Sequence, residues 1–96
     1  MIIPDTVKIL GYTYQVKKVN DRLKNNGVNT AGSCSCVNQT IWIDTASTQE
    51  QQESTFIHEI LEALDYHLNL GLGDAKICPL ESGLYQVLKD NFLTKE

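Results

Sequence analysis

The stretch IHEILEAL at residues 57–64 decides the fold, because its apolar residues recur with the period of an α-helix. Spacings of three and four residues place one apolar stripe on a single helix face, formed by Ile57, Ile60, Leu61, Leu64 and Leu68. The stripe predicts a helix that faces the core. His58 and Glu62 lie four residues apart, so they share a second face that borders the stripe, with Glu59 between them.

This helix is expected to span residues 47–70, after a β-rich part over residues 1–46. Ser47 and Glu50 match the capping box that begins many helices. Two glycines are expected to stop the helix, Gly71 and Gly73.

The β-rich part contains runs in which apolar and polar residues alternate, as they do in half-buried strands. The runs predict two hairpins, one from residues 7–10 and 12–16 and one from residues 33–37 and 40–44. Residues 20–29 are polar and rich in Asn and Gly, so a loop is expected there.

A second helix is expected over residues 77–93, beginning near Pro79, whose missing N–H suits a first helical turn. Its buried stripe is predicted to be Leu80, Leu84, Val87 and Leu88. Gly83 within the helix indicates the close approach of a neighbouring backbone. The sequence therefore predicts a single α+β domain over residues 1–96, with a small, mainly antiparallel sheet of three to four strands followed by two packed helices.

The composition argues against several classes of protein. Hydrophobic residues make up 42% of the chain and charged residues 21%, as in ordinary globular proteins. A net charge of −4 argues against binding to nucleic acid, which requires clustered Lys and Arg. No apolar run reaches the roughly 18–20 residues of a membrane span, and the N-terminus lacks the pattern of a signal peptide. We expect a cytoplasmic protein, monomeric or homodimeric, without a nucleic-acid or membrane partner.

His58 and Glu62 are candidate metal ligands, and a hydrolytic zinc site needs a third protein ligand beside an open position for water. Glu81 is the candidate third ligand, because a helix–turn–helix return brings the polar faces of the two helices together. Tyr85 lies four residues after Glu81, on the same face. Taken alone, a His–Glu pair at this spacing is more often a surface ion pair than a metal site.

The segment HEILE at residues 58–62 resembles the zinc-peptidase signature HExxH with its second histidine replaced by glutamate. From about residue 55 to residue 91 the chain is similar to the gluzincins, the thermolysin-like metallopeptidases, and to short phage-encoded proteins. The resemblance implies a zincin-like fold, a peptide substrate and a zinc ion held by His58, Glu62 and Glu81. It also implies that Glu59 is the general base and that residues 40–44 form the edge strand that pairs with substrate.

Two further roles follow from the resemblance: Asp65 would accept the free ring N–H of His58, and Tyr85 would donate a hydrogen bond to the developing oxyanion. Glu62 departs from the family pattern and makes the site neutral around a divalent ion, so a bound water would be less acidic. Two carboxylates also shift the preference towards Mn²⁺ or Fe²⁺. The alternative is a catalytically inactive phage or prophage accessory protein that uses the same fold to bind a host protein.

The three cysteines and the second histidine are the other residues of the chain to consider as metal ligands. Cys34 and Cys36 share one face of a predicted strand and, together with Cys78, form a candidate second metal site, although small buried thiols are the more common explanation. His67 lies nine positions after His58, on the opposite side of a helix, so it is not expected to bind the same metal ion.

Overall fold

The computed structural model describes residues 1–20, 23–25 and 28–92, without the side chains of residues 23–25 and 28–30. Within these residues the chain forms β1 (Thr6–Ile9), β2 (Tyr12–Val19), β3 (Leu23–Asn25), β4 (Val28–Thr30), β5 (Gly32–Ser35), β6 (Thr40–Asp44), α1 (Gln49–Leu68) and α2 (Asp74–Asn91). The predicted α+β class is confirmed, because a mostly antiparallel sheet is followed by two helices.

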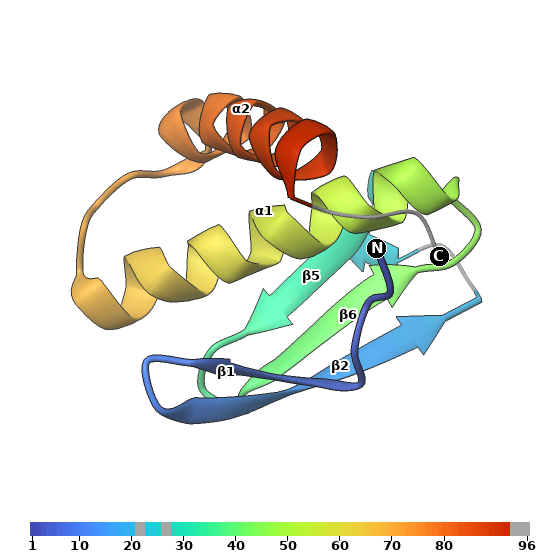
Figure 1. Cartoon of the computed structure of the whole chain (residues 1–96). Coiled ribbons are helices and arrows are strands. Elements are labelled where there is room, and N and C mark those ends of the chain that lie inside the picture. Colours follow the sequence, from blue (N-terminus) through green and yellow to red (C-terminus); the bar gives the residue numbers. More distant parts are fainter. Residues whose placement is uncertain (21–22, 26–27, 93–96) are drawn as a thin grey trace.

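Four strands of the described residues form one sheet in the order β1-β2-β6-β5 (Figure 1). The hairpins β1–β2 and β5–β6 are antiparallel, as predicted, and β2 pairs with β6 in parallel. The strand at residues 40–44 is therefore internal, which corrects the prediction that it forms the edge, and the edge strands of this sheet are β1 and β5.

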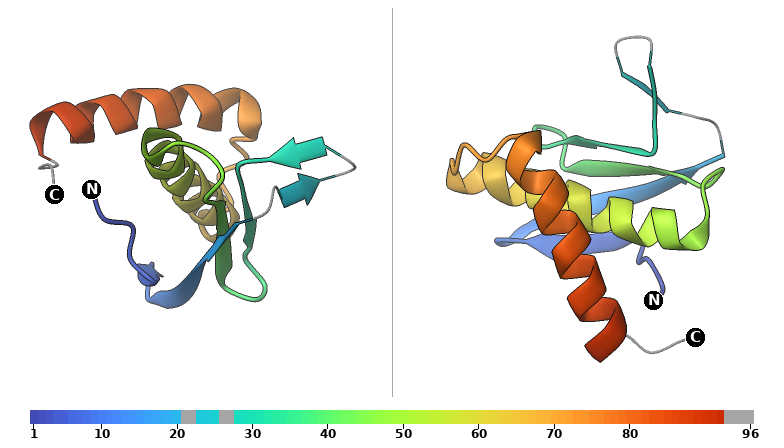
Figure 2. Two further views of the ribbon diagram at one scale, coloured as in Figure 1. Left: turned by 90° about the vertical axis from the view of Figure 1, so that its right-hand side faces the viewer. Right: turned by 90° about the horizontal axis from the view of Figure 1, so that it is seen from above.

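The segment at residues 20–29 is not simply a loop. The strands β3 and β4 pair with each other as a separate antiparallel hairpin, which projects away from the sheet (Figure 2). The prediction of a loop is wrong for these strands, and residues 21–22 and 26–27 of the segment lie outside the described residues.

The two helices form two layers on one face of the sheet. The helix α1 lies against the sheet, and α2 crosses α1 on the side away from the sheet (Figures 1 and 2). The core between the sheet and α1 is formed by Ile3, Ile9, Tyr14, Val16, Ile41, Ile43, Phe56 and Ala63. Burying a large apolar side chain stabilises a fold by about 1.5–3 kcal/mol, so this core holds α1 firmly on the sheet.

The ends of α1 lie slightly inside the predicted limits. Thr48 is the N-cap rather than Ser47, and its hydroxyl oxygen accepts a hydrogen bond from the backbone N–H of Gln51 at 3.1 Å. Asn69 ends the helix in the left-handed conformation, with φ of 53°. The two glycines that were predicted to stop the helix lie beyond this end, at Gly71 and Gly73.

The apolar stripe predicted for α1 is only partly correct. Ile57 is buried, and Ile60 and Leu64 pack against the core, but Leu68 is exposed. The buried surface of α1 also contains polar residues: Glu53, Thr55 and Glu59. A helix between a sheet and a second helix is covered on two sides, so polar side chains near each boundary lose contact with water.

The helix α2 begins at Asp74, earlier than the predicted start at residue 77, and Pro79 lies inside it. A proline removes one backbone hydrogen bond, a cost that this helix bears close to its first turn. Gly83 has no described atom within 4 Å of the position that a Cβ would take, so the predicted close backbone approach is wrong.

The predicted buried stripe of α2 is also wrong. Leu80, Leu84 and Val87 are 47%, 40% and 43% exposed, and Ile77 is the buried residue of this helix. As the outer layer, α2 packs mainly against α1 among the described residues, so much of its apolar surface stays in water. In the part of the chain that the structure describes, neither helix has the length and hydrophobicity needed to cross a membrane.

Candidate metal centre

A cleft of about 550 Å³ lies between α1, β5 and the first turns of α2. Polar side chains and the backbone of β5 form most of its wall, which consists of Ala31, Gly32, Ser33, Cys34, Gln51, Thr55, His58, Glu59, Glu62, Asp74 and Glu81. We call it the acidic cleft, because four carboxylates and one imidazole face it. Such groups are the usual protein ligands of divalent cations.

Each ring nitrogen of His58 faces a carboxylate. Nδ1 lies 2.8 Å from Oε1 of Glu81, and Nε2 lies 2.8 Å from Oε2 of Glu62. A third carboxylate, that of Asp74, has an oxygen 3.9 Å from Nε2. Burial alone would lower the pKa of His58, but the hydrogen bonds to Glu81 and Glu62 and the charge of Glu59 raise it above its ordinary value. In the absence of metal, the imidazole therefore binds a proton more tightly than a free histidine does.

Glu59 is a buried acid with an unsatisfied oxygen. Glu59 is 4% exposed, and its Oε1 has no hydrogen-bond partner among the described residues. Burial and the charge of Glu62 raise the pKa of Glu59 from 4.5 to about 8, although His58 acts in the opposite direction. Leaving such an atom unpaired costs about 1–3 kcal/mol. An ion or an ordered water is one of the ways in which a buried oxygen of this kind is satisfied.

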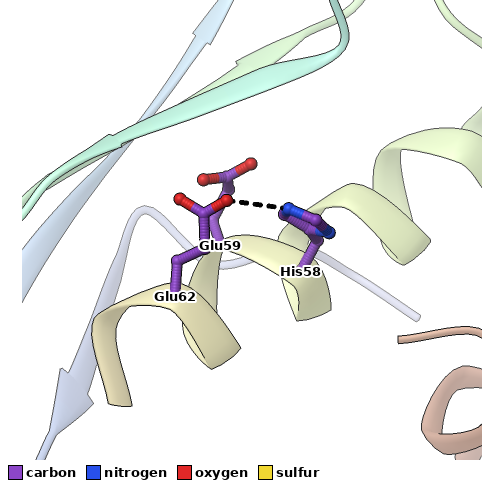
Figure 3. Close-up of side chains that lie close together, drawn as sticks. All are labelled: His58, Glu59 and Glu62. Atoms are coloured by element: carbon purple, nitrogen blue, oxygen red, sulfur yellow. Dashed lines mark hydrogen bonds and ion pairs between the residues drawn. The ribbon is translucent and has the colours of Figure 1, made fainter. Parts of the chain in front are cut away.

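His58, Glu59 and Glu62 form a group that could hold a metal ion. Each offers one ligand atom, and these atoms all lie within 4.8 Å of one another. The three side chains project from neighbouring positions on α1, and the ion pair between His58 and Glu62 is drawn in Figure 3. One imidazole nitrogen and two carboxylate oxygens suit Zn²⁺ and also harder ions such as Mn²⁺ and Fe²⁺.

Glu81 contacts His58 but is not part of this group of three. One of its carboxylate oxygens holds Nδ1 of His58, and the other contacts the hydroxyl of Ser54. The lone pairs of Nδ1 and Nε2 point in different directions from the imidazole ring. An ion bound to Nε2 would therefore lie away from Glu81, which contacts Nδ1. Carboxylates in this position orient metal-binding histidines in many sites. The direct ligand role of Glu81 stays a prediction.

Tyr85 and Asp65 are not among the residues that line the acidic cleft. The hydroxyl of Tyr85 donates a hydrogen bond to Oε1 of Glu53 at 2.6 Å. Asp65 accepts a hydrogen bond at 3.0 Å from a backbone N–H in the loop that follows α1. Because α2 crosses α1, successive turns of α2 meet different parts of α1, and Tyr85 is carried away from the cleft. The roles of both residues in a reaction stay predictions.

Tyr85→Phe is expected to lower the free energy of unfolding by about 1–2 kcal/mol and to leave metal affinity unchanged, because it removes a donor from the carboxylate of the buried Glu53. Urea unfolding and a Mn²⁺ titration measure the two effects. Tyr66→Phe is the matched control, since the side chain of Tyr66 is exposed. Loss of metal binding in Tyr85→Phe, with stability unchanged, would contradict this placement.

Gly32 allows β5 to approach α1 closely. A Cβ at this position would clash with Cγ2 of Thr55 and would lie 3.2 Å from Oε2 of Glu59. The absence of a side chain thus lets Glu59 pack against the strand that lines the cleft. Sequence reasoning missed this residue, although a glycine inside a strand is a known signal of close approach.

Gly32→Ala is expected to destabilise the protein by about 1–3 kcal/mol, because β5 or Glu59 must move to accommodate the methyl group. It is also expected to weaken the binding of Mn²⁺ in a titration. Gly83→Ala is the control: it has open space and a helical position, so it is expected to stabilise the protein by about 0.5–1 kcal/mol. Equal stability of Gly32→Ala and wild type would contradict the close packing of β5 on α1.

The second histidine lies in a different cluster, in agreement with the helical spacing. Nε2 of His67 is 2.6 Å from the hydroxyl of the buried Tyr14. The ring of His67 stacks on Tyr12 with a centroid distance of 4.3 Å. His67 therefore takes part in aromatic packing at the end of α1, and it does not line the acidic cleft.

The site is assigned from its geometry. No protein-family model matches the chain, and no curated protein and no solved structure matches it significantly. The capacity of the cleft for a metal ion thus rests on the ligand-atom distances, the burial of Glu59 and the charges around His58.

Proposed function

We propose that this protein binds one divalent metal ion in the acidic cleft and uses it to hydrolyse peptide bonds. The observation that carries the proposal is Oε1 of Glu59, a buried oxygen without a partner beside His58 and Glu62. A cation would satisfy this oxygen and replace the proton of the imidazole. Zn²⁺ suits the donor set, and the two carboxylates make Mn²⁺ and Fe²⁺ the alternatives.

The residues of the cleft divide into ligands and a positioning residue. His58 through Nε2, Glu59 and Glu62 would hold the ion. In place of the ligand role predicted for it from the sequence, Glu81 would keep the imidazole oriented through its contact with Nδ1. A bound divalent ion acidifies water and polarises a carbonyl group. Glu59 has a second carboxylate oxygen, which would accept the proton of the attacking water, the role that the gluzincin resemblance gives to this glutamate.

The open edge of β5 offers a place for an extended peptide. It is one of the two edge strands of the four-stranded sheet among the described residues, and unlike β1 it lies at the acidic cleft, which residues 31–34 line. Backbone N–H and C=O groups of an edge strand pair readily with an added strand. We therefore transfer the substrate-binding role from residues 40–44, which lie inside the sheet, to β5.

Bound metal and peptide hydrolysis are to be measured on the same preparations of wild type, His58→Ala and Glu59→Gln. After zinc addition, His58→Ala is expected to bind one equivalent less than wild type. Glu59→Gln is expected to be inactive even at a zinc concentration that saturates it, whereas wild type is active. Equal metal content in wild type and His58→Ala would contradict the site, and full activity of Glu59→Gln would contradict the role of its carboxylate.

A second candidate function is partner binding without catalysis, as in an accessory protein. The observation that favours it is the exposed apolar side of α2, with Leu80, Leu84 and Val87 one helical turn apart. Wild type that contains metal, is folded and hydrolyses no peptide in a diverse library would favour this function over the enzyme.

A further inference from the structure

We propose that Cys34 and Cys36 form a second metal site, distinct from the group on α1, that binds one thiophilic metal ion through both sulfurs. The two Sγ atoms lie 3.8 Å apart. In a tetrahedral site with metal–sulfur bonds of about 2.3 Å, two thiolate ligands are separated by about 3.8 Å. The pair thus has the spacing of a chelating dithiolate before any metal binds.

The backbone fixes this spacing. Cys34 pairs with Ile41 of β6 in the sheet, and Cys36 is the first residue of the turn that follows β5. Ser35, between the two cysteines, accepts a hydrogen bond from the backbone N–H of Asn38 at 3.3 Å. Thr40 donates to the carbonyl of Asn38 at 3.1 Å. The turn that begins at Cys36 is therefore held at both ends, so chelation requires little rearrangement.

A metal ion at this pair must displace thiol protons. Burial and the neighbouring thiol of Cys36 raise the pKa of Cys34 far above its ordinary value, which makes its thiol a poor nucleophile and means that a bound ion must displace its proton. Cys34 lines the acidic cleft together with Glu59, and the negative charge there attracts cations. Both cysteines are half-buried, so ions can reach them, and a soft ion displaces the thiol protons.

The third cysteine is not part of this site. Cys78 is exposed on α2 and is not among the residues that line the acidic cleft. It therefore serves as an internal control that has the same chemistry without the neighbouring thiol. The candidate metal site of three cysteines that the sequence suggested is therefore reduced to the pair Cys34 and Cys36.

Cd²⁺ is the probe, because its bonds to thiolates give an ultraviolet charge-transfer absorption that carboxylate and imidazole ligands do not give. The reduced full chain is titrated as wild type, Cys34→Ser, Cys36→Ser and Cys78→Ser. Wild type and Cys78→Ser are expected to bind one Cd²⁺ at the dithiol pair, which the full thiolate absorption reports. Either Cys34→Ser or Cys36→Ser is expected to weaken binding by roughly 10²- to 10⁴-fold, because the chelate is lost. Unchanged affinity in both of these variants would overturn the proposal.

Two further measurements keep the result specific. His58→Ala is expected to retain the cadmium absorption, so failure of the dithiol site and failure of the proposed function are separable. If the serine variants do not fold, alkylation of wild type with iodoacetamide tests whether Cys34 and Cys36 bind the ion. Cd²⁺ is expected to protect Cys34 and Cys36 and to leave Cys78 reactive, and equal alkylation of the three cysteines in the presence of Cd²⁺ would contradict the site.

Discussion

Glu59→Gln is expected to make the metal-free protein more stable than wild type at pH 9, by about 2–4 kcal/mol. The pKa of Glu59 rises from 4.5 to about 8 on folding, so the folded state binds this proton more tightly than the unfolded state does. The stability that this group contributes is therefore fully present below about pH 4.5. It declines as the pH rises and is lost above about pH 8. Glutamine resembles the protonated carboxyl group and cannot ionise, so the variant keeps this stability at high pH.

Urea unfolding in the presence of a chelator, at pH 5 and pH 9, measures the effect. Glu59→Gln is expected to have nearly the stability of wild type at pH 5 and to exceed it at pH 9. Glu50→Gln is the control, because Glu50 is an exposed acid whose ion pair with Lys89 lies on the surface, where solvent screens it. A variant that is less stable than wild type at pH 9 would show that Glu59 is not a strained, desolvated acid.

His58→Ala is expected to abolish the stabilisation of the protein by Mn²⁺ and to weaken its binding more than about 100-fold. An ion at about 100 times its dissociation constant stabilises the folded state by about 2.7 kcal/mol. Mn²⁺ is chosen because thiolates bind it weakly, so that the signal reports on the carboxylate and imidazole ligands.

The matched control is His67→Ala, which removes the second of the two histidines in the chain. This variant loses the contact with Tyr14 and is expected to be about 1 kcal/mol less stable without metal. Its response to Mn²⁺ in thermal unfolding is expected to equal that of wild type. An equal response of His58→Ala and wild type would show that the acidic cleft does not bind the ion.

Local regularities made the main features of this site predictable. The spacing of His58 and Glu62 fixes their positions on a helix surface whatever the helix packs against, and the structure has their side chains 2.8 Å apart. The alternation of residues likewise predicts the hairpins β1–β2 and β5–β6, because it depends on neighbouring residues only. Neither kind of prediction requires knowledge of the tertiary arrangement.

Features that depend on the order of layers and strands were not predictable in this way. The apolar pattern of α2 defines a helix face but not whether another element covers it, and Leu80 and Leu84 are exposed because α2 is the outer layer. Alternation does not reveal which strand is at the edge of a sheet, so the parallel pairing of β2 with β6 was missed. The contact of Tyr85 with Glu53 depends on how α2 crosses α1, which helical spacing alone does not contain.

The most direct test of the metal centre is to locate the ion in crystals of the zinc-loaded protein by anomalous scattering at the zinc edge. The geometry predicts a peak about 2.0–2.1 Å from Nε2 of His58 and about 2.0–2.2 Å from a carboxylate oxygen of Glu59 and of Glu62. Glu81 is expected to remain hydrogen-bonded to Nδ1 of the same ring. An empty cleft in crystals that hold zinc elsewhere, or an ion bound through Nδ1 and Glu81, would contradict this account.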